Sequence, residues 1–198
     1  MEHKFIFQTS SISLIPVLST NVSVIRVDKS NHNWVIALYV TALTLFPNLS
    51  QATPAGGEVV SGAGNITQSA ATTTVTQATQ NLSVNWKSFN VAPQEVVNFV
   101  QPSTSSIAVN RILDTNGSQI LGNINANGQV FLINPNGILF GQGSQVNVRG
   151  LVASALDFND AHLNGNAKMF SGNGTGSIIN QGNLTAANGG YVALLGKT

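Results

Sequence analysis

Asn-Gly pairs divide the chain into short segments, and this spacing constrains the fold more than any other feature of the sequence. The pairs lie at 116–117, 127–128, 136–137, 164–165, 173–174 and 188–189, with a short apolar segment between one pair and the next. Asn-Gly is a strong turn signal. Because apolar runs this short cannot form helices, the pattern predicts short strands joined by tight corners.

The turns and strands together predict a coil of roughly 20 residues that repeats along the chain. No long segment has a helical hydrophobic period. A single coil cannot bury its apolar side, so the coils must stack into a parallel β-solenoid. We expect its interior to contain Val146, Val148, Ile179 and Val192.

The segment Gly128–Gly141 shows the corner chemistry most clearly. Asn134, Pro135, Asn136 and Gly137 each suit one position of a type I turn, from a side chain that bonds the following backbone to a final glycine. The flanking runs 130–133 and 138–140 are β-branched, aromatic and apolar throughout, so they predict strands buried on both sides.

The two ends of the solenoid differ in sequence. The irregular strands between residues 53 and 112 are the candidate N-terminal cap, because an uncapped edge would pair with another chain. Residues 190–196 show no cap and stop where a coil would end. We therefore expect the natural β-helix to continue beyond residue 198.

Charged side chains are scarce. Asp, Glu, Lys and Arg make up 8% of the 198 residues, against about 25% in an average soluble protein. Polar uncharged residues must supply the surface, which suits stacked strands because like charges would repeat there at close spacing. With a net charge of +1 and no basic cluster, the sequence lacks the footprint of a nucleic-acid-binding protein. It has no cysteine, which excludes disulfides and thiolate metal sites.

Residues 1–52 have the character of an export signal. An apolar run from Trp34 to Phe46 has signal-peptide length and is short for a membrane-spanning helix. Ser50 and Ala52 are small residues at the positions that a signal peptidase reads, so we expect cleavage between Ala52 and Thr53. The lead before the run is long and weakly basic, which indicates an extended signal or a start further along the chain. A buried strand or an anchor is the alternative.

Several runs of the sequence resemble one known family: Asn85–Asn90, Val100–Ser103, Asn110–Ile112, Ile120–Ile138, Leu151–Ser154 and Gly190–Leu194. In this order they resemble the N-terminal secretion (TPS) domain of filamentous haemagglutinin-type two-partner secretion proteins. Residues 134–138 match the NPNGI motif of that family. The second motif of some members, Asn-Pro-Asn-Leu, has no match, and residues 100–112 occupy its region as in the high-molecular-weight adhesin branch.

The resemblance implies a fold, a route and a partner. The fold is an all-β, right-handed parallel β-helix with an N-terminal β cap and short extra-helical strands or hairpins. The chain would comprise a cleaved extended signal peptide (1–52) and a secretion domain (53–198), and would pass through the periplasm to be secreted or displayed on the cell surface. Its partner would be a TpsB-type outer-membrane transporter with periplasmic POTRA domains. The function would be secretion and folding nucleation of a large adhesin-type exoprotein, whose C-terminal part would meet a host or neighbouring cell.

Two groups of residues are candidates for the functional surface. Asn134, Pro135, Asn136, Gly137 and Ile138 either shape a corner of the solenoid or touch the transporter, and we expect the corner role to dominate. Asn110 and Arg111 are the second group. Arg111 is a rare charge that would dock a partner carboxylate, although capping of a carbonyl or pairing with Asp114 is the expectation we favour.

Catalysis and metal binding have little support in the sequence. Asp157, Asp160 and His162 are the one cluster of plausible metal ligands, but a polar loop lacks the rigid face and second shell of a metal site, so we predict a solvated loop with no metal. We predict no cofactor and no enzyme, because the acids are scattered and no nucleophile elbow or phosphate loop is present. Two alternatives stay open: a carbohydrate-active β-helix enzyme, and the N-terminal part of a contact-dependent toxin delivery protein.

Overall fold

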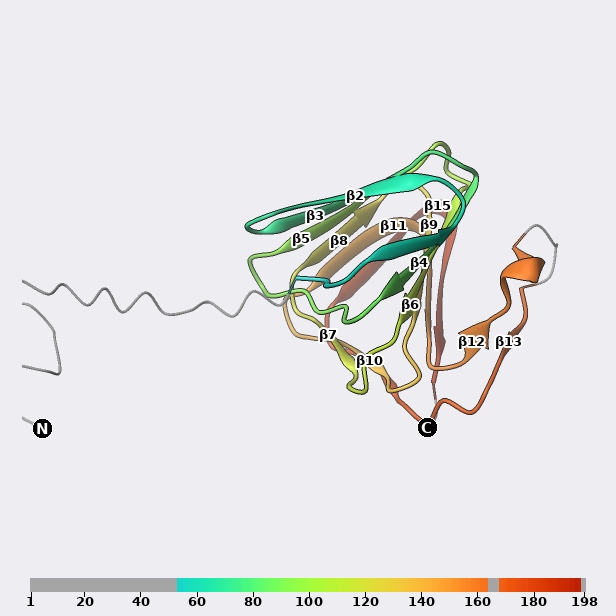
Figure 1. Cartoon of the computed structure of the whole chain (residues 1–198). Coiled ribbons are helices and arrows are strands. Elements are labelled where there is room, and N and C mark those ends of the chain that lie inside the picture. The colour runs from blue at the N-terminus through green and yellow to red at the C-terminus, as the bar shows by residue number, and fades with distance from the viewer. Residues whose placement is uncertain (1–52, 164–167, 197–198) are drawn as a thin grey trace, which may run out of the picture. The chain divides into compact units, whose positions relative to one another are not determined.

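Figure 1 shows a computed structural model of the chain, which describes residues 53–163 and 168–196. The predicted signal peptide lies outside these residues. None of the described residues form a helix long and apolar enough to cross a bilayer. The elements are β1 (Glu58–Ser61), β2 (Gly64–Ser69), β3 (Thr72–Gln77), β4 (Asn81–Trp86), β5 (Val96–Val100), β6 (Ile107–Ile112), β7 (Ser118–Ile120), β8 (Asn123–Ala126), β9 (Gln129–Ile133), β10 (Ile138–Phe140), β11 (Gln145–Ser154), β12 (Asp157–Phe158), a 3-10 turn η1 (Asp160–His162), β13 (Phe170–Ser171), β14 (Ile178–Asn180) and β15 (Asn183–Leu195).

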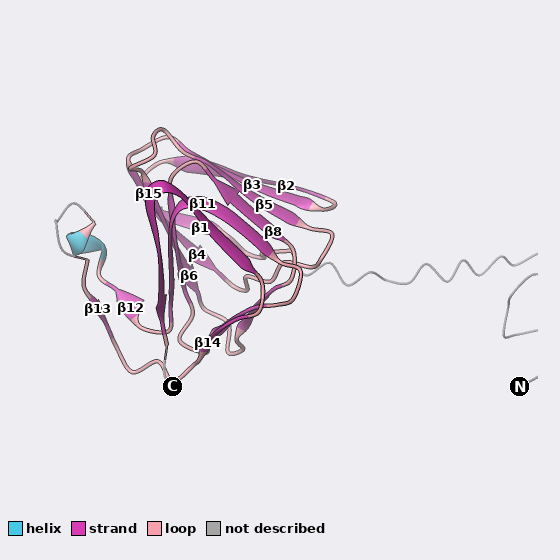
Figure 2. Ribbon diagram, turned by 180° about the vertical axis from the view of Figure 1, so that it is seen from behind, coloured by secondary structure: helices cyan, strands magenta, loops and turns pink. Residues whose placement is uncertain are grey.

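The chain winds through three sheet faces in a repeating order (Figures 1 and 2). The first face holds β3, β5, β8 and the first halves of β11 and β15, all parallel. The second face holds β4, β6, β9 and the second halves of β11 and β15, also parallel. The third face holds β7, β10 and β14. The predicted parallel β-helix is confirmed.

Register between the coils gives the length of the repeat. Val97, Ile124, Val146 and Leu184 form one column of the first face, so successive coils are 27 residues (97 to 124) and 22 residues (124 to 146) long. These lengths are close to the predicted repeat. The next interval, from 146 to 184, is 38 residues because an arm is inserted in that coil.

The interior of the coils is apolar and tightly closed. Val146 and Val148 lie there as predicted, with 0% and 4% of their surface exposed. The largest side chains of the interior are buried aromatics, and Trp86 meets Phe89 edge to face with ring centroids 5.4 Å apart. Burial of such stacked apolar columns is the main stabilising term of the fold.

The interior prediction was wrong for Ile179, which is 47% exposed, whereas Val192 faces the interior as predicted but is 39% exposed. Ile179 is in register with Leu139 and Gln119 on the outer side of the third face. Val192 continues the interior column of Leu151, but no described strand pairs with the other edge of β15. One residue therefore points outward, and the other lies inward without a covering coil.

Two antiparallel strands cover the N-terminal end of the helix. β1 pairs with β4 on the second face, and β2 pairs with β3 on the first. Because β3 and β4 already pair in parallel with β5 and β6, they belong to the coils. The cap therefore spans residues 58–69 and is shorter than the predicted range of 53 to 112.

An arm leaves the coils between β11 and β14, on the right of Figure 1 and the left of Figure 2. We define the arm as residues 157–163 and 168–171, which carry β12, η1 and β13. Its apolar side chains complete a second cluster on the outer side of the second face: Ile107, Val109, Phe131, Ile133, Val152, Phe158 and Leu163. The second face is thus buried on both sides, which explains why its strands read as continuous apolar runs.

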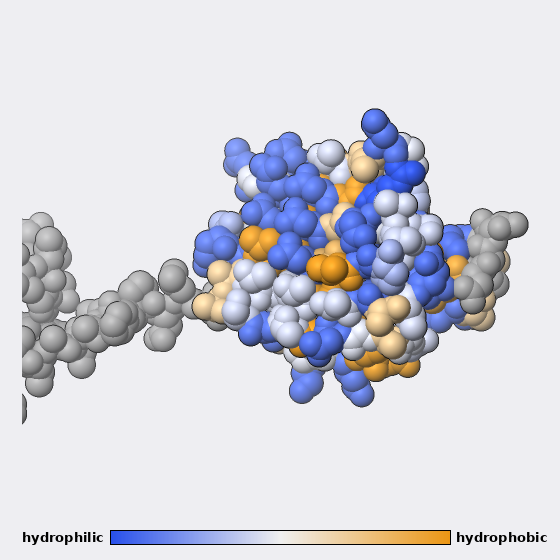
Figure 3. All heavy atoms as spheres, turned by 90° about the horizontal axis from the view of Figure 1, so that it is seen from above, coloured by the Kyte–Doolittle hydropathy of each residue, from blue (hydrophilic) through white to orange (hydrophobic). Residues whose placement is uncertain are grey.

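The surface is hydrophilic despite the scarcity of charge. The side of the molecule in Figure 3 is mostly hydrophilic or intermediate in hydropathy, with small hydrophobic patches between. On the first face Asn98, Asn125 and Asn147 form a ladder, in which Asn125 donates to Asn98 at 3.2 Å and Asn147 to Asn125 at 3.3 Å. Amide ladders of this kind solvate a stacked sheet without the repulsion that a column of like charges would produce.

Candidate functional site

The NPNGI segment folds into the turn that its residues predict. Asn134 Oδ1 accepts a hydrogen bond from the Asn136 amide at 2.9 Å, and the Gly137 amide donates to the Asn134 carbonyl at 2.9 Å. Gly137 has a φ of 99°. This is a conformation that side chains with a Cβ rarely adopt, so glycine fits it at the lowest energetic cost. The turn connects β9 on the second face to β10 on the third.

Asn134 ties this corner to the coils before and after it. Its side chain is 0% exposed, and Nδ2 donates to the Asn116 carbonyl at 3.1 Å and to Ser118 Oγ at 3.0 Å. Its amide donates to the Ser154 carbonyl at 2.9 Å. Each polar atom of the buried amide therefore has a partner, as a buried amide needs. Asn134 has a stacking role and has no surface left to offer to another protein.

Gly137 ties the corner to the coil after it. A Cβ at this position would lie 2.6 Å from the Ser177 carbonyl oxygen, which accepts a hydrogen bond from the Ile138 amide at 3.1 Å. A Cβ on Gly176 would lie 2.0 Å from the Gly137 nitrogen. The two corners are therefore in direct backbone contact, and both need glycine for this close approach.

The exposed part of the motif is small. Pro135 and Asn136 are exposed, whereas Asn134, Gly137 and Ile138 are buried. Asn136 Nδ2 donates to the Asp114 carbonyl at 2.8 Å, so its side chain lies along the corner of the preceding coil. The structure therefore assigns three residues of the motif to shape and leaves two on the surface.

Asn110 lies inside the helix, in the interior column of Val84 and Leu132. It is 0% exposed, its Oδ1 accepts from Trp86 Nε1 at 3.0 Å, and its Nδ2 donates to the Ala108 and Phe131 carbonyls at 3.1 and 3.3 Å. Since a fully buried side chain cannot touch another protein, Asn110 is removed from the candidate contacts. Its role is to satisfy the indole of Trp86.

Arg111 faces outward and holds the arm. Its Nη2 and Nη1 donate to the two carboxylate oxygens of Asp160 at 2.6 and 3.2 Å, and Nε donates to Asp157 Oδ1 at 3.1 Å. Nη2 also donates to the Phe158 carbonyl. The expected capping of a carbonyl is present, but pairing with Asp114 was wrong, because that carboxylate accepts instead from the Asn116 amide at 3.0 Å.

The arm is anchored, so the prediction of a solvated loop was wrong for Asp160, whereas the side chain of Asp157 is bonded to Arg111 but is 64% exposed. Ser83 Oγ donates to Asp160 Oδ2 at 2.7 Å, which links the arm to β4 as well. Phe158 is 1% exposed and meets Phe131 edge to face, with centroids 5.5 Å apart, and Phe170 at 5.0 Å. Sequence reasoning missed Ser83 and both arm phenylalanines; aromatic residues inside a polar stretch were the available signal.

The guanidinium of Arg111 stays charged under all ordinary conditions. Burial acts to lower its pKa, but the hydrogen bonds and charges of Asp160 and Asp157 outweigh this effect, so the pKa lies above its usual value. The side chains of Arg111 and Asp160 are 19% and 33% exposed, so this pair is better shielded from solvent than a surface salt bridge, whereas Asp157 is 64% exposed. Charge-assisted bidentate geometry adds to its strength.

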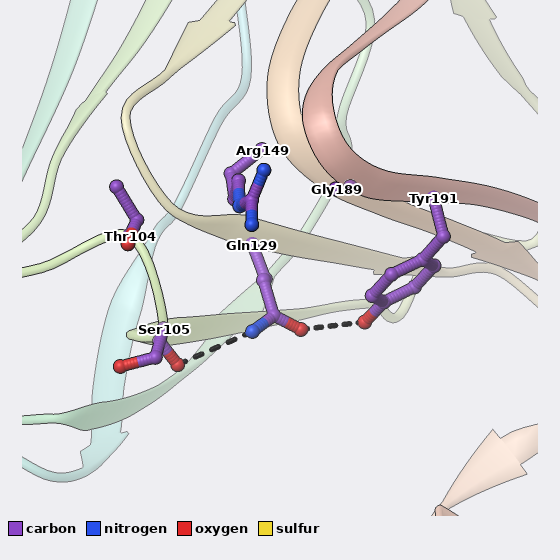
Figure 4. Close-up of a pocket in the computed structure, with 7 residues that line it drawn as sticks. Thr104, Ser105, Gln129, Arg149, Gly189 and Tyr191 are labelled. Atoms are coloured by element: carbon purple, nitrogen blue, oxygen red, sulfur yellow. Dashed lines mark hydrogen bonds between the residues drawn. The ribbon is translucent and has the colours of Figure 1, made fainter.

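Two neighbouring hollows lie at the corner between the first and second faces and share Thr104 and Arg149. The smaller has a volume of about 140 Å³ and appears in Figure 4, where Tyr191 donates to Gln129 Oε1 at 2.6 Å and Gln129 Nε2 donates to the Ser105 carbonyl at 3.3 Å. Neither hollow is lined by an acid or a histidine. Within the described part of the chain there is also no group of three metal-ligating side chains.

Comparison of the sequence with known proteins gives one family and several relatives. Residues 50–198 match the family model of the TPS secretion domain. The chain is 40% identical over 113 residues to a heme/hemopexin-binding protein of Haemophilus influenzae (strain ATCC 51907 / DSM 11121 / KW20 / Rd), a match that covers 57% of this chain and 12% of that protein. A second Haemophilus influenzae heme/hemopexin-binding protein is 39% identical over 98 residues, which cover 50% of this chain and 11% of that protein.

A solved structure is similar in both fold and sequence. The crystal structure of the HMW1 secretion domain from Haemophilus influenzae matches with a TM-score of 0.65 and 32% identity, covering 71% of this chain and 38% of that one. This chain thus spans only a small part of the length of its relatives. Because the family model spans the whole described part and the β-helix agrees, the chain belongs to the TPS secretion domain family.

Proposed function

We propose that the chain is the secretion and folding-nucleation module of a large exoprotein, and that a cognate TpsB-type outer-membrane transporter recognises it in the periplasm. Family membership establishes a role in secretion. The observation that carries the proposal is the corner at 134–138, which is bonded to the coils before and after it and still leaves Pro135 and Asn136 exposed.

The buried half of the motif supports nucleation of folding. Asn134 and Gly137 fix the corner against Ser118 and Ser177, which belong to the neighbouring coils. In a solenoid each coil forms on the edge of the previous one, so a well-fixed early corner lowers the barrier for the coils that follow.

The exposed half supports recognition. Pro135 has no backbone donor and a fixed φ, and Asn136 presents an amide beside it. We propose that the POTRA domains of the transporter contact these two residues. In the folded domain Arg111 is occupied by Asp157 and Asp160, so it is not part of this contact.

The proposal includes the fate of both ends of the chain. Residues 1–52 would act as an extended signal peptide that is cleaved between Ala52 and Thr53, and the domain would then cross the periplasm to the cell surface or the medium. The β-helix would continue in the natural protein beyond residue 198. An adhesin is the first candidate for that remainder, and the names of the two relatives make binding of heme or hemopexin the second.

We assign no catalytic role to the domain. A carbohydrate-active β-helix enzyme needs paired carboxylates or an equivalent acid and base in one groove. The two hollows of the described residues are lined by hydroxyl, amide, apolar and arginine side chains, and the acids of the arm are engaged with Arg111.

Binding of the chain to the purified periplasmic part of its transporter tests the proposal. Asn136→Ala removes one exposed hydrogen bond, so we expect a loss of stability of at most about 1 kcal/mol together with clearly weaker binding. Asn188→Ala is the matched control, because Asn188 is an exposed member of another Asn-Gly pair at a different corner. Equal binding by both variants and the wild type would show that the motif acts through shape alone.

A further inference from the structure

The arm covers a surface that is well suited to hold another polypeptide. Beneath it, Val109, Phe131, Val152 and Ala193 occupy one outward column of the second face. Val109 and Phe131 are 0% exposed, and Val152 is 3% exposed, with the arm in place. We call this column, with the flanking Ile107 and Ile133, the outer strip.

The arm adds no strand to the sheet that it covers. β12 and β13 pair with each other, and neither of them pairs with a coil strand in the described structure. Phe158 and Phe170 of the arm make ring contacts with Phe131, and Leu163 packs in the same buried cluster. Hydrogen bonds from Arg111 and Ser83 to Asp160 also hold the arm in place. The arm can therefore lift without breaking any backbone hydrogen bond between the strands of adjacent coils.

Chain order makes the uncovered strip a real stage of folding. β6, β9 and β11, which carry five of the six strip residues, all precede the arm in the sequence. A chain that folds in coils from its N-terminal end builds most of the strip before residues 157–171 can close over it. At that stage the outer strip lies on a folded sheet and faces the solvent.

The charge of Arg111 determines which kind of segment can bind the outer strip. With the arm absent, the outer strip borders the guanidinium of Arg111, whose two carboxylate partners both come from the arm. The complement is a segment with an aromatic or aliphatic side chain flanked by acids, which is the chemistry of Asp157-Phe158-Asn159-Asp160 itself. A bidentate carboxylate on a partly buried guanidinium gives such a contact its specificity.

We propose that the outer strip and Arg111 form a second transporter-binding surface, which receives an acidic-aromatic segment of the periplasmic part until the arm displaces it. This inference rests on the proposed function, since the transporter is the partner. The arm and the transporter segment compete for the same surface. Arm closure would then release the folded domain from its transporter.

Competition predicts the sign of the effect of opening the arm. If the arm is closed most of the time, the apparent affinity for the transporter equals the affinity of the open form multiplied by the fraction of open molecules. A substitution that raises the ratio of open to closed molecules tenfold therefore raises the apparent affinity by up to about tenfold. Asp160→Ala removes the carboxylate that accepts from Ser83 and from Nη1 and Nη2 of Arg111. It leaves the strip, the guanidinium and the bond from Nε to Asp157 intact. Arg111→Met frees the arm as well, but it also removes the charge that the partner needs.

The experiment measures Kd for the purified periplasmic part of the transporter, with hydrogen exchange reporting on the arm and on β6 and β9. We expect Asp160→Ala to bind about tenfold tighter than the wild type and Arg111→Met to show no such gain. Glu58→Ala is the control, because it removes one exposed acid from the cap. Should the arm of Asp160→Ala exchange like that of the wild type, the double variant Asp160→Ala with Phe158→Ala takes its place.

Two results would overturn the inference. Weaker binding by the open-arm variant would mean that the arm belongs to the binding surface, and unchanged binding with an open arm would mean that the strip is not used. In both cases a wild type that binds leaves the proposed function intact. If the wild type and every variant fail to bind, the proposed function falls together with the inference.

Discussion

Replacing Gly137 with alanine and comparing the result with Gly143→Ala isolates the close approach at the NPNGI corner. Both glycines have a positive φ, 99° for Gly137 and 87° for Gly143. A Cβ on Gly143 would meet nothing within 4 Å, whereas a Cβ on Gly137 would meet the Ser177 oxygen at 2.6 Å. The pair therefore shares its backbone strain and differs in steric contact.

The magnitudes follow from these two terms. Left-handed backbone costs an L-residue about 1 to 2 kcal/mol, and both variants bear this cost. In Gly137→Ala the Ser177 carbonyl must also move, which weakens its 3.1 Å bond from the Ile138 amide and strains the next corner. A lost bond costs about 1 kcal/mol and overpacking about 1 to 3 kcal/mol. We expect Gly137→Ala to lower the free energy of unfolding by about 2 kcal/mol or more beyond the loss in Gly143→Ala.

Urea unfolding followed by far-ultraviolet circular dichroism measures this difference. The comparison is made from the midpoints of variants that keep the same slope against denaturant. Equal destabilisation by the two substitutions would refute the reasoning, because the backbone contact between corners would then carry no cost. A larger effect at Gly143 would contradict the stacking of the corner outright.

Three further predictions concern the interior, the motif and the last strand. Asn134→Asp removes the Nδ2 donor to Asn116 and Ser118 and buries a carboxylate, so it should lower the free energy of unfolding in urea by about 2 to 4 kcal/mol. Asn136→Ala should lower it by about 1 kcal/mol or less. The reverse order would contradict the burial of the motif. Trp86→Phe leaves the Oδ1 of Asn110 without its indole donor and should cost about 1 to 3 kcal/mol, and an unchanged melting temperature would show that this bond is dispensable. The edge of β15 carries exposed Tyr191, Val192 and Leu194, so light scattering of the chain at rising concentration should show association, and a strict monomer would disprove an accessible edge.

Local chemistry is what the sequence predicted well. The corner at 134–137 needs a particular residue at each position for reasons that lie within four residues, and its turn formed as expected. The short apolar runs 130–133 and 138–140 are strands. Stacking of coils followed from the inability of one coil to bury its own apolar side.

Pairing over long distances is what the sequence could not predict. Arg111 and Asp160 are 49 residues apart, and their contact depends on where the arm crosses the second face. Asp114 was the nearer acid in sequence, but its carboxylate is used inside its own turn. Adjacent apolar residues posed the same problem. On the third face Ile178 is partly buried and Ile179 is exposed, and the sequence of two consecutive isoleucines does not show which of them points into the core.

Secretion of the chain in cells with and without its cognate transporter tests the central claim most directly. The amount of protein released to the medium is compared for the wild type, Gly137→Ala and Gly143→Ala. We predict release that depends on the transporter, strong loss for Gly137→Ala and near-normal release for Gly143→Ala, since only the first disturbs contact between coils. Equal release in cells that lack the transporter would contradict the claim that this domain is a secretion module read by that partner.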